Sequence, residues 1–259
     1  MRFKISYLAV VLALVMSACA GGEASKTITD STPVSDTLPT LVTPQPTPCV
    51  DGPFVIVTDM DSTIRADIRY AGSNNFVGTA LDGYLQPIAI LTRQAAEALV
   101  KVNKQLREQG LGLLIYDAYR PQRAVDHILR WSHQSADTLT RQQFYPHLSK
   151  YQIRCQGYIS RRSKHAMGST VDLTIISLAT GQPIDMGSGF DMLDPISNFH
   201  AAGLTSQQSQ NRQLLRNVMC RNGFYPIEAE WWHFTLCNQP YTRAFDISVH
   251  RDSVALFLR

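Results

Sequence analysis

Two short segments constrain the fold most, because they hold the side chains of one possible metal site and lie far apart in the chain. Residues 163–172 read SKHAMGSTVD, and residues 228–233 read EAEWWH. Their candidate zinc ligands are His165, Asp172 and His233. Two imidazoles and one carboxylate leave a fourth zinc position open for water, as a catalytic site requires. The chain must therefore fold so that the two segments meet.

The local sequence restricts how these side chains are presented. Gly168 and the β-branched residues after it disfavour a helix, so we expect a loop carrying His165 into a strand that begins near Asp172. Glu230 is the candidate base for the water. It lies three residues before His233, which on a regular strand puts the two on opposite faces. Glu230 must then lie in a turn, in a bulge or just before the strand.

The N-terminus has the residue order of a bacterial lipoprotein signal. Arg2 and Lys4 precede an apolar run at 5–15 that is too short to span a bilayer, and small residues then lead to Cys19. We expect cleavage before Cys19 and lipid on its sulfur and amine; the alternative is an ordinary signal with an incidental cysteine. Loss of residues 1–18 lowers the formal net charge from +3 to +1. A nearly neutral chain without a basic run gives no reason to expect nucleic acid.

Composition divides the chain into three parts. We expect residues 1–18 to form the signal peptide and residues 19–48 a lipidated, disordered tether, because the latter hold too few large apolar residues to offset the cost of ordering. Residues 49–259 are enough for one domain with its own core. Ala20 stands where an aspartate often retains lipoproteins in the inner membrane, so we expect the outer membrane of a Gram-negative envelope, facing the periplasm.

Four cysteines remain after the lipidated one. In an exported protein they permit two disulfides, and four cysteines allow three connectivities. A zinc cage built from them is disfavoured because none of the spacings approaches C-x2-C. Disulfides and free buried thiols both stay open for these residues: Cys49, Cys155, Cys220 and Cys237.

Apolar periodicity and end signals predict mixed structure. Thr92 is a candidate cap for one helix and Thr205 for another, and Pro121 suits the first turn of a third. Helices and strands do not alternate regularly enough for a doubly wound sheet. We therefore expect an α+β fold, a single domain with a central, mainly antiparallel sheet flanked by helices. The expected helices are 93–109, 121–133 and 206–222, and the expected strands are 111–116, 171–177 and 234–237.

Three further motifs join the two described above. They are IRYA with NNFVG at 68–78, YDAYRPQRAV at 116–125 and DMGSGFD at 185–191. In this order the five motifs resemble the zinc D,D-peptidases of family M15, and most closely the D-alanyl-D-alanine dipeptidases of the VanX type. The likeness runs from about Phe54 to Phe245. It implies the zinc D,D-peptidase or hedgehog-like fold and one Zn2+ per chain.

The resemblance also implies catalytic roles. His165, Asp172 and His233 would be the zinc ligands, and Glu230 the general base that later protonates the leaving amine. Arg120 would stabilise the oxyanion, a role that suits a guanidinium because it stays charged and donates along a planar fork. Without the motif, Arg120 would be a surface arginine beside a helix start.

Other positions match the substrate side of the family site. Asp191 would meet the free amino group of the dipeptide, because an anion facing an ammonium is a direct way to require a free N-terminus. Ser163 and Tyr70 would line the same pocket. Asp117 would lie behind the site and orient Arg120 or a metal ligand, although capping of a turn would explain it as well.

The implied activity is zinc-dependent hydrolysis of D-Ala-D-Ala to two D-alanines, in turnover or scavenging of cell-wall peptide. The protein would bind the membrane through its lipid anchor, and no protein partner is expected. The alternative enzyme is a zinc D,D-carboxypeptidase or endopeptidase acting on peptidoglycan stem peptides. A wall-binding lipoprotein without activity is a third reading, but a binding module has no need of the base Glu230. Cobalt or nickel could occupy the same ligand set in vitro.

Overall fold

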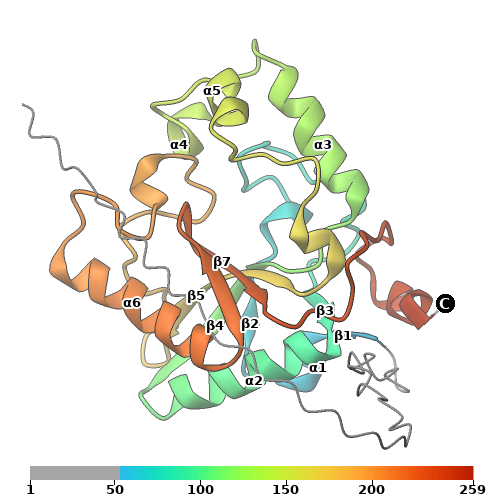
Figure 1. Ribbon diagram of the computed structural model, residues 1–259, viewed down its shortest axis with the longest axis vertical. Helices are drawn as coiled ribbons and strands as arrows, with labels where there is room; N and C mark the ends of the chain where they lie inside the picture. The colour runs from blue at the N-terminus through green and yellow to red at the C-terminus, as the bar shows by residue number, and fades with distance from the viewer. Residues whose placement is uncertain (1–52, 259) are drawn as a thin grey trace, which may run out of the picture. The chain divides into compact units, whose positions relative to one another are not determined.

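A five-stranded sheet is the central element of the protein, which is described here over residues 53–258 from a computed structural model (Figure 1). Its strand order is β2-β4-β5-β7-β6, and every neighbouring pair is antiparallel except β2 with β4. The prediction of an α+β domain with a mainly antiparallel sheet is confirmed. The strands are β2 (Arg65–Ala66), β4 (Leu111–Asp117), β5 (Thr170–Ser177), β6 (Phe224–Ile227) and β7 (Glu230–Leu236).

Strand β5 forms the middle of this sheet. Its sequence TVDLTIIS is rich in β-branched residues, and all but the last residue are buried. It pairs with β4 from Leu111 opposite Ser177 to Asp117 opposite Asp172, and with β7 from Thr170 opposite Thr235 to Asp172 opposite His233. The strands predicted at 111–116 and 171–177 are thus present, each longer by one residue.

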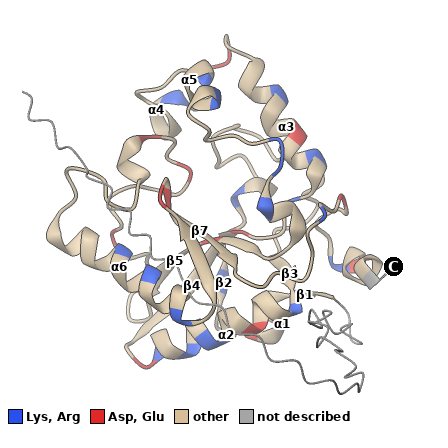
Figure 2. Cartoon of the chain, viewed as in Figure 1, with Lys and Arg blue, Asp and Glu red and all other residues tan. Residues whose placement is uncertain are grey.

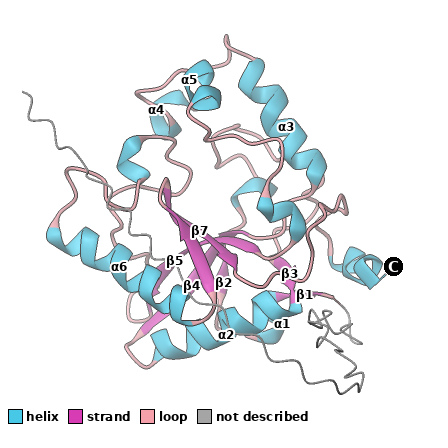
Figure 3. Cartoon of the chain, viewed as in Figure 1, coloured by secondary structure: helices cyan, strands magenta, loops and turns pink. Residues whose placement is uncertain are grey.

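Helices flank the sheet, as Figure 3 shows. Helices α2 and α6 contact each other and pack against the sheet, α2 on β4 and α6 on β6 and β7. Figure 2 shows basic residues spread over α2, α3, α5 and α6, with acidic residues between them. The helices are α1 (Val57–Met60), α2 (Arg93–Arg107), α3 (Gln122–His133), α4 (Arg141–Phe144), α5 (Lys150–Cys155) and α6 (Ser206–Arg221).

The predicted helix ends differ in how well they match. Thr205 caps α6 as expected: its side chain accepts from the backbone N–H of Gln208, and the Gln208 side chain returns a bond to the cap. Thr92 holds the cap position of α2 but makes no capping hydrogen bond, because its hydroxyl lies 2.8 Å from that of Ser169. The side-chain cap predicted at Thr92 is therefore wrong, and Pro121 precedes α3 instead of lying in its first turn.

A second, two-stranded sheet pairs β1 with β3, and short 3-10 turns complete the fold. Phe54 of β1 packs against Tyr119, Tyr241, Phe245 and Phe257. This aromatic cluster attaches the C-terminal turn to the domain. The remaining elements are β1 (Phe54–Ile56), β3 (Ile90–Thr92), η1 (Arg69–Ala71), η2 (Lys164–Met167), η3 (Pro195–Ser197) and η4 (Arg251–Leu258).

Several predictions concern residues outside the described part. The signal at 1–18, the lipidated Cys19, the tether at 19–48 and Cys49 all lie there. Within 53–258, Cys155, Cys220 and Cys237 are free and exposed, and no disulfide joins them. No helix in that same range has both the length and the apolar character needed to cross a membrane.

Candidate metal site and catalytic pocket

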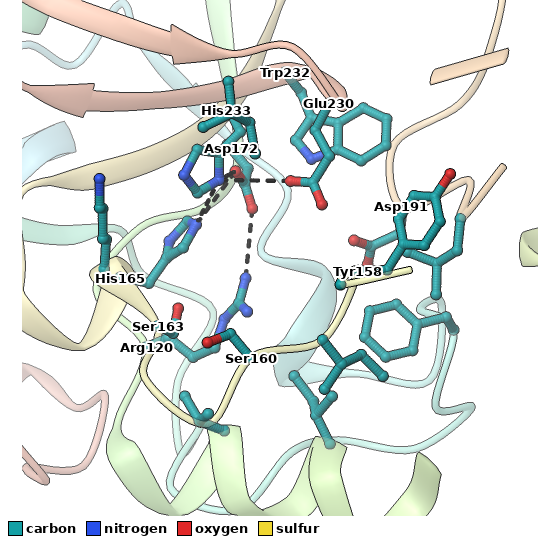
Figure 4. Close-up of a pocket in the computed structure, with 18 of the residues that line it drawn as sticks. Arg120, Tyr158, Ser160, Ser163, His165, Asp172, Asp191, Glu230, Trp232 and His233 are labelled. Carbon is teal, nitrogen blue, oxygen red and sulfur yellow. Dashed lines mark hydrogen bonds and ion pairs between the residues drawn. The ribbon is translucent and has the colours of Figure 1, made fainter. Parts of the chain in front are cut away.

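The three candidate metal ligands meet at the end of the central sheet. Asp172 of β5 and His233 of β7 are direct cross-strand partners, and His165 lies on the 3-10 turn η2 just before β5. His165 and Asp172 are buried, while the side chain of His233 retains 12% exposure. The expected loop at His165 is thus a short helical turn. Figure 4 shows the three side chains converging.

Gly168 makes the step from η2 into β5 possible. Its φ of 82° lies in the left-handed region, and a Cβ built there would come within 2.1 Å of the Phe54 ring. Its carbonyl also accepts from the backbone N–H of Thr92 at 2.7 Å. Any larger residue would push β1 away from the turn that carries His165.

The ligand atoms have the spacing that zinc needs. His165 Nε2 lies 3.3 Å from His233 Nδ1 and 3.3 Å from Asp172 Oδ1, and His233 Nδ1 lies 3.0 Å from Asp172 Oδ1. Tetrahedral zinc with bonds of about 2.0 to 2.2 Å places its ligand atoms about 3.3 Å apart.

The hydrogen bonds around the ligands also fit a shared cation. His165 Nδ1 lies 2.7 Å from the carbonyl of Ala118, so its N–H points there and the lone pair of Nε2 faces the cluster. Asp172 Oδ1 is buried and accepts no hydrogen bond of good geometry, although two imidazole nitrogens are near. Burial acts to raise the pKa of Asp172, but the imidazoles of His165 and His233 outweigh it and hold that pKa below its usual range. The residues present therefore fit a metal ion.

Glu230 reaches the same cluster from the first position of β7. Its Oε2 lies 3.6 Å from His233 Nδ1, although the two residues are three apart on a strand. The pairing of β6 with β7 is irregular at Ile227 opposite Glu230, and this local distortion turns the carboxylate inward. The expectation that Glu230 lies where the strand is irregular is confirmed, although Glu230 is the first residue of β7 and does not precede the strand. Burial raises its pKa to about 7.

Arg120 approaches the cluster from the loop after β4. Its Nε donates to Asp117 Oδ2 at 2.9 Å, and its Nη2 lies 3.4 Å from Asp172 Oδ2. Asp117 is fully buried, accepts a short hydrogen bond from the Tyr84 hydroxyl and lies 3.4 Å from His165 Nδ1. Asp117 therefore contacts both Arg120 and His165 from behind the site, in the position expected of a residue that orients them. Tyr84, which holds Asp117 in turn, was not predicted.

Asp191, labelled in Figure 4, and Tyr70 line the same cavity. The Tyr70 hydroxyl donates to Asp191 Oδ1 at 3.0 Å, and its ring lies 4.7 Å below the Arg120 guanidinium. Asp191 Oδ2 is buried and has no hydrogen-bond partner. Burial raises the pKa of Asp191 well above its usual range, and the nearby Asp172 adds to the shift. This carboxylate is thus short of one cationic or proton-donating partner.

The cavity holds about 200 Å3 and is lined by all the residues predicted to bind metal, to catalyse or to contact substrate, while Asp117 lies behind it. Ser163 lines it at the start of η2. Trp232 and Tyr158 also line it and are labelled in Figure 4. Neither residue was among the predicted site residues, and Tyr158 lies on a segment without helix or strand.

Comparisons with known proteins agree on one family. Residues 52–250 match the Peptidase_M15 family, described as D-ala-D-ala dipeptidase. A D-alanyl-D-alanine dipeptidase of Streptomyces coelicolor is 41% identical over 190 residues, covering 73% of this chain and 94% of the relative. The corresponding values are 39% over 188 residues, 73% and 93% for one of Enterococcus faecalis, and 36% over 192 residues, 74% and 95% for one of Enterococcus faecium.

Proposed function

This chain belongs to the D-Ala-D-Ala dipeptidase family Peptidase_M15, and we propose from its geometry how its own residues carry out the reaction. It is a zinc metallopeptidase that hydrolyses D-Ala-D-Ala to two D-alanines. The observation that carries the mechanism is the meeting of a metal-ligand cluster, a carboxylate base and an arginine at one small cavity.

His165, Asp172 and His233 would hold one zinc ion per chain. A bound zinc ion would act as a Lewis acid that polarises the scissile carbonyl, and it would lower the pKa of a bound water to about 7. Ala118 fixes the ring of His165 through its carbonyl, and β-sheet pairing fixes Asp172 against His233. The protein thus presents three rigid ligands and leaves the cavity side open.

Glu230 transfers the proton during the reaction, and Arg120 stabilises the negative charge that develops on the carbonyl oxygen. Glu230 accepts the proton of the attacking water and returns it to the amide nitrogen as the C–N bond breaks, and a pKa near 7 suits both transfers. Arg120 donates to the carbonyl oxygen as it becomes negative. Asp117 keeps the guanidinium in place through the 2.9 Å hydrogen bond.

Asp191 recognises the free amino group of the dipeptide. Its Oδ2 is buried and has no hydrogen-bond partner, which costs free energy. A substrate ammonium would supply both the positive charge and the N–H donor that this oxygen lacks. Tyr70 holds the other oxygen, so the carboxylate cannot turn away. Ser163 lines the same cavity and contributes to the substrate pocket.

The function is tested by measuring D-alanine release from free D-Ala-D-Ala and from a stem peptide whose amino group is blocked. A dipeptidase with an amine site cleaves the free dipeptide and leaves the blocked peptide intact. Cleavage of the blocked peptide alone would instead make the chain a D,D-carboxypeptidase or endopeptidase, the second enzyme class that this ligand set serves.

Substitution Asp191→Asn is expected to raise KM for D-Ala-D-Ala by about 10- to 100-fold, because the amide loses the charge-assisted bond to the ammonium. The value of kcat should change much less, since Asp191 does not touch the scissile bond. Steady-state kinetics of D-alanine release check this. Asp126→Asn, on the exposed side of α3, is the control, and an unchanged KM in Asp191→Asn would remove the amine site from this residue.

The N-terminal sequence supports a place in the cell envelope. Residue order at 1–19 favours export, cleavage and lipid attachment at Cys19, which would anchor the domain at the membrane, facing the periplasm and with the outer membrane favoured. An enzyme at that location suits turnover or scavenging of wall-derived dipeptide. Labelled palmitate should enter the wild-type protein and not Cys19→Ser. An uncleaved, unlabelled chain in the cytosolic fraction would refute the anchor.

A further inference from the structure

Arg212 of α6 is a buried arginine that pairs with no acid. Its side chain is 1% exposed. Among residues 53–258 its guanidinium forms no ion pair, although the charge of Asp185 acts on it and opposes the effect of burial on its pKa. Burial lowers the pKa of Arg212 to about 10, so it remains charged at neutral pH. A buried charge without a counterion is costly unless hydrogen bonds compensate it. The hydrogen-bond acceptors of Arg212 therefore identify the part of the chain that it stabilises.

All the acceptors of Arg212 lie in one segment, residues 186–198. Nε donates to the carbonyl of Met186 at 2.6 Å, Nη1 to that of Asn198 at 2.6 Å and Nη2 to that of Ile196 at 2.9 Å. These carbonyls lie at the two ends of the segment, so one planar group closes it into a loop. Apart from the short turn η3, this loop has no helix or strand of its own.

The loop closed by Arg212 carries Asp191 at its middle. Asp191 has a φ of 63°, and it is the one residue other than glycine with positive φ in the described part of the chain. A non-glycine residue keeps such a conformation only where its surroundings impose it. The loop therefore needs outside support to keep Asp191 aimed into the cavity.

A second connection runs from the same guanidinium to the strand of the catalytic base. Ser188 Oγ lies 3.4 Å from Arg212 Nη2 and accepts from Trp231 Nε1 at 2.9 Å. Trp231 follows Glu230 on β7. Helix α6, the Asp191 loop and the start of β7 thus share one hydrogen-bonded junction with Arg212 at its centre.

We propose that Arg212 is a positioning residue that holds loop 186–198 so that Asp191 faces the substrate amine, and that it thereby sets the enzyme's preference for free dipeptides. The inference rests on the role proposed for Asp191. Arginine suits this task because its planar fork reaches several carbonyls at once, whereas the single ammonium of lysine cannot span both ends of the loop.

The test compares Arg212→Met and Arg212→Lys with Arg221→Met, a control at the exposed end of α6. Inhibition constants are measured for two phosphinate analogues of D-Ala-D-Ala that differ only in the presence of the amino group. Kinetics with D-Ala-D-Ala, bound zinc and hydrogen exchange of loop 186–198 are measured on the same proteins.

Arg212→Met is expected to lose about tenfold or more of the wild-type preference for the amine-bearing inhibitor, because the loop loses the three charge-assisted hydrogen bonds to its carbonyls. KM should rise with it, while kcat, zinc content and the binding of the inhibitor without the amine stay within about threefold. Exchange should quicken within 186–198, Arg212→Lys should show the same changes to a smaller degree, and the control should show none.

If Arg212 only stabilises the fold, the variants should show a different pattern of results. Lower stability with unchanged KM and unchanged amine preference in the folded variants would overturn the proposal, and so would quicker exchange without a change in preference. If Arg212→Met does not fold, Arg212→Lys decides between these patterns. Failure of the proposed amine site is recognised separately, because the wild-type enzyme would then bind both inhibitors equally.

Discussion

Replacing Glu230 by glutamine is expected to lower kcat for D-Ala-D-Ala by about 10³-fold while KM changes little. Glutamine keeps the size and the position of the side chain at the start of β7 but cannot accept the proton of the attacking water. The measurement is D-alanine release under saturating substrate. Because Glu230 is not one of the three metal ligands, the variant should also retain bound zinc.

Glu228→Gln is the matched control for this substitution. Glu228 lies two residues earlier, its side chain is 63% exposed and it pairs with Arg216 at 2.7 Å, away from the cavity. It should therefore keep wild-type kcat. If Glu230→Gln retained more than about a tenth of the wild-type rate, another group would have to serve as the base, since loss of a general base costs about 10² to 10⁴ in rate.

Replacing His233 by alanine is expected to remove both bound zinc and measurable dipeptide hydrolysis. The substitution takes away one of only two imidazole ligands and leaves His165 and Asp172 as an incomplete set. Metal analysis of the purified protein and D-alanine release test the two effects together. Wild-type enzyme stripped by a chelator should regain activity when zinc is restored, and His233→Ala should not.

The control for this change is His133→Ala, an exposed histidine at the end of α3. It should retain both zinc and activity. Full zinc content in His233→Ala would assign the metal to other side chains, and activity that survives complete chelation would separate the hydrolysis from the metal. Either result would contradict the site as proposed.

The sequence predicted those features that short motifs or strand patterns encode. The run from Val171 to Ser177 is rich in β-branched residues, and the strand predicted there is present as β5. The three-residue spacing of Glu230 and His233 required an irregular strand start, and the pairing with β6 has its irregularity there. Strand β7 nevertheless begins four residues before the predicted strand, because Glu230 pairs with Ile227 of β6 and His233 pairs with Asp172 of β5. Strand β6, which contains Pro226, was not predicted.

Features that depend on backbone acceptors had no signal in the sequence. Arg212 binds carbonyls, which every residue has, so nothing in the residue types near Met186 or Asn198 indicated the contact. The cap expected from Thr92 failed for a related reason. Its hydroxyl has a tertiary partner in Ser169, and only the three-dimensional structure brings those residues together.

The position of β7 determines when the active site can form during synthesis and folding. This strand enters the sheet between β5 and β6, yet it comes last of the strands in the chain and carries both Glu230 and His233. Contacts between residues distant in sequence form slowly. A chain still emerging from the ribosome therefore has neither the base nor the complete ligand set. The growing polypeptide can hydrolyse the dipeptide only after this final strand has been synthesised and has joined the sheet.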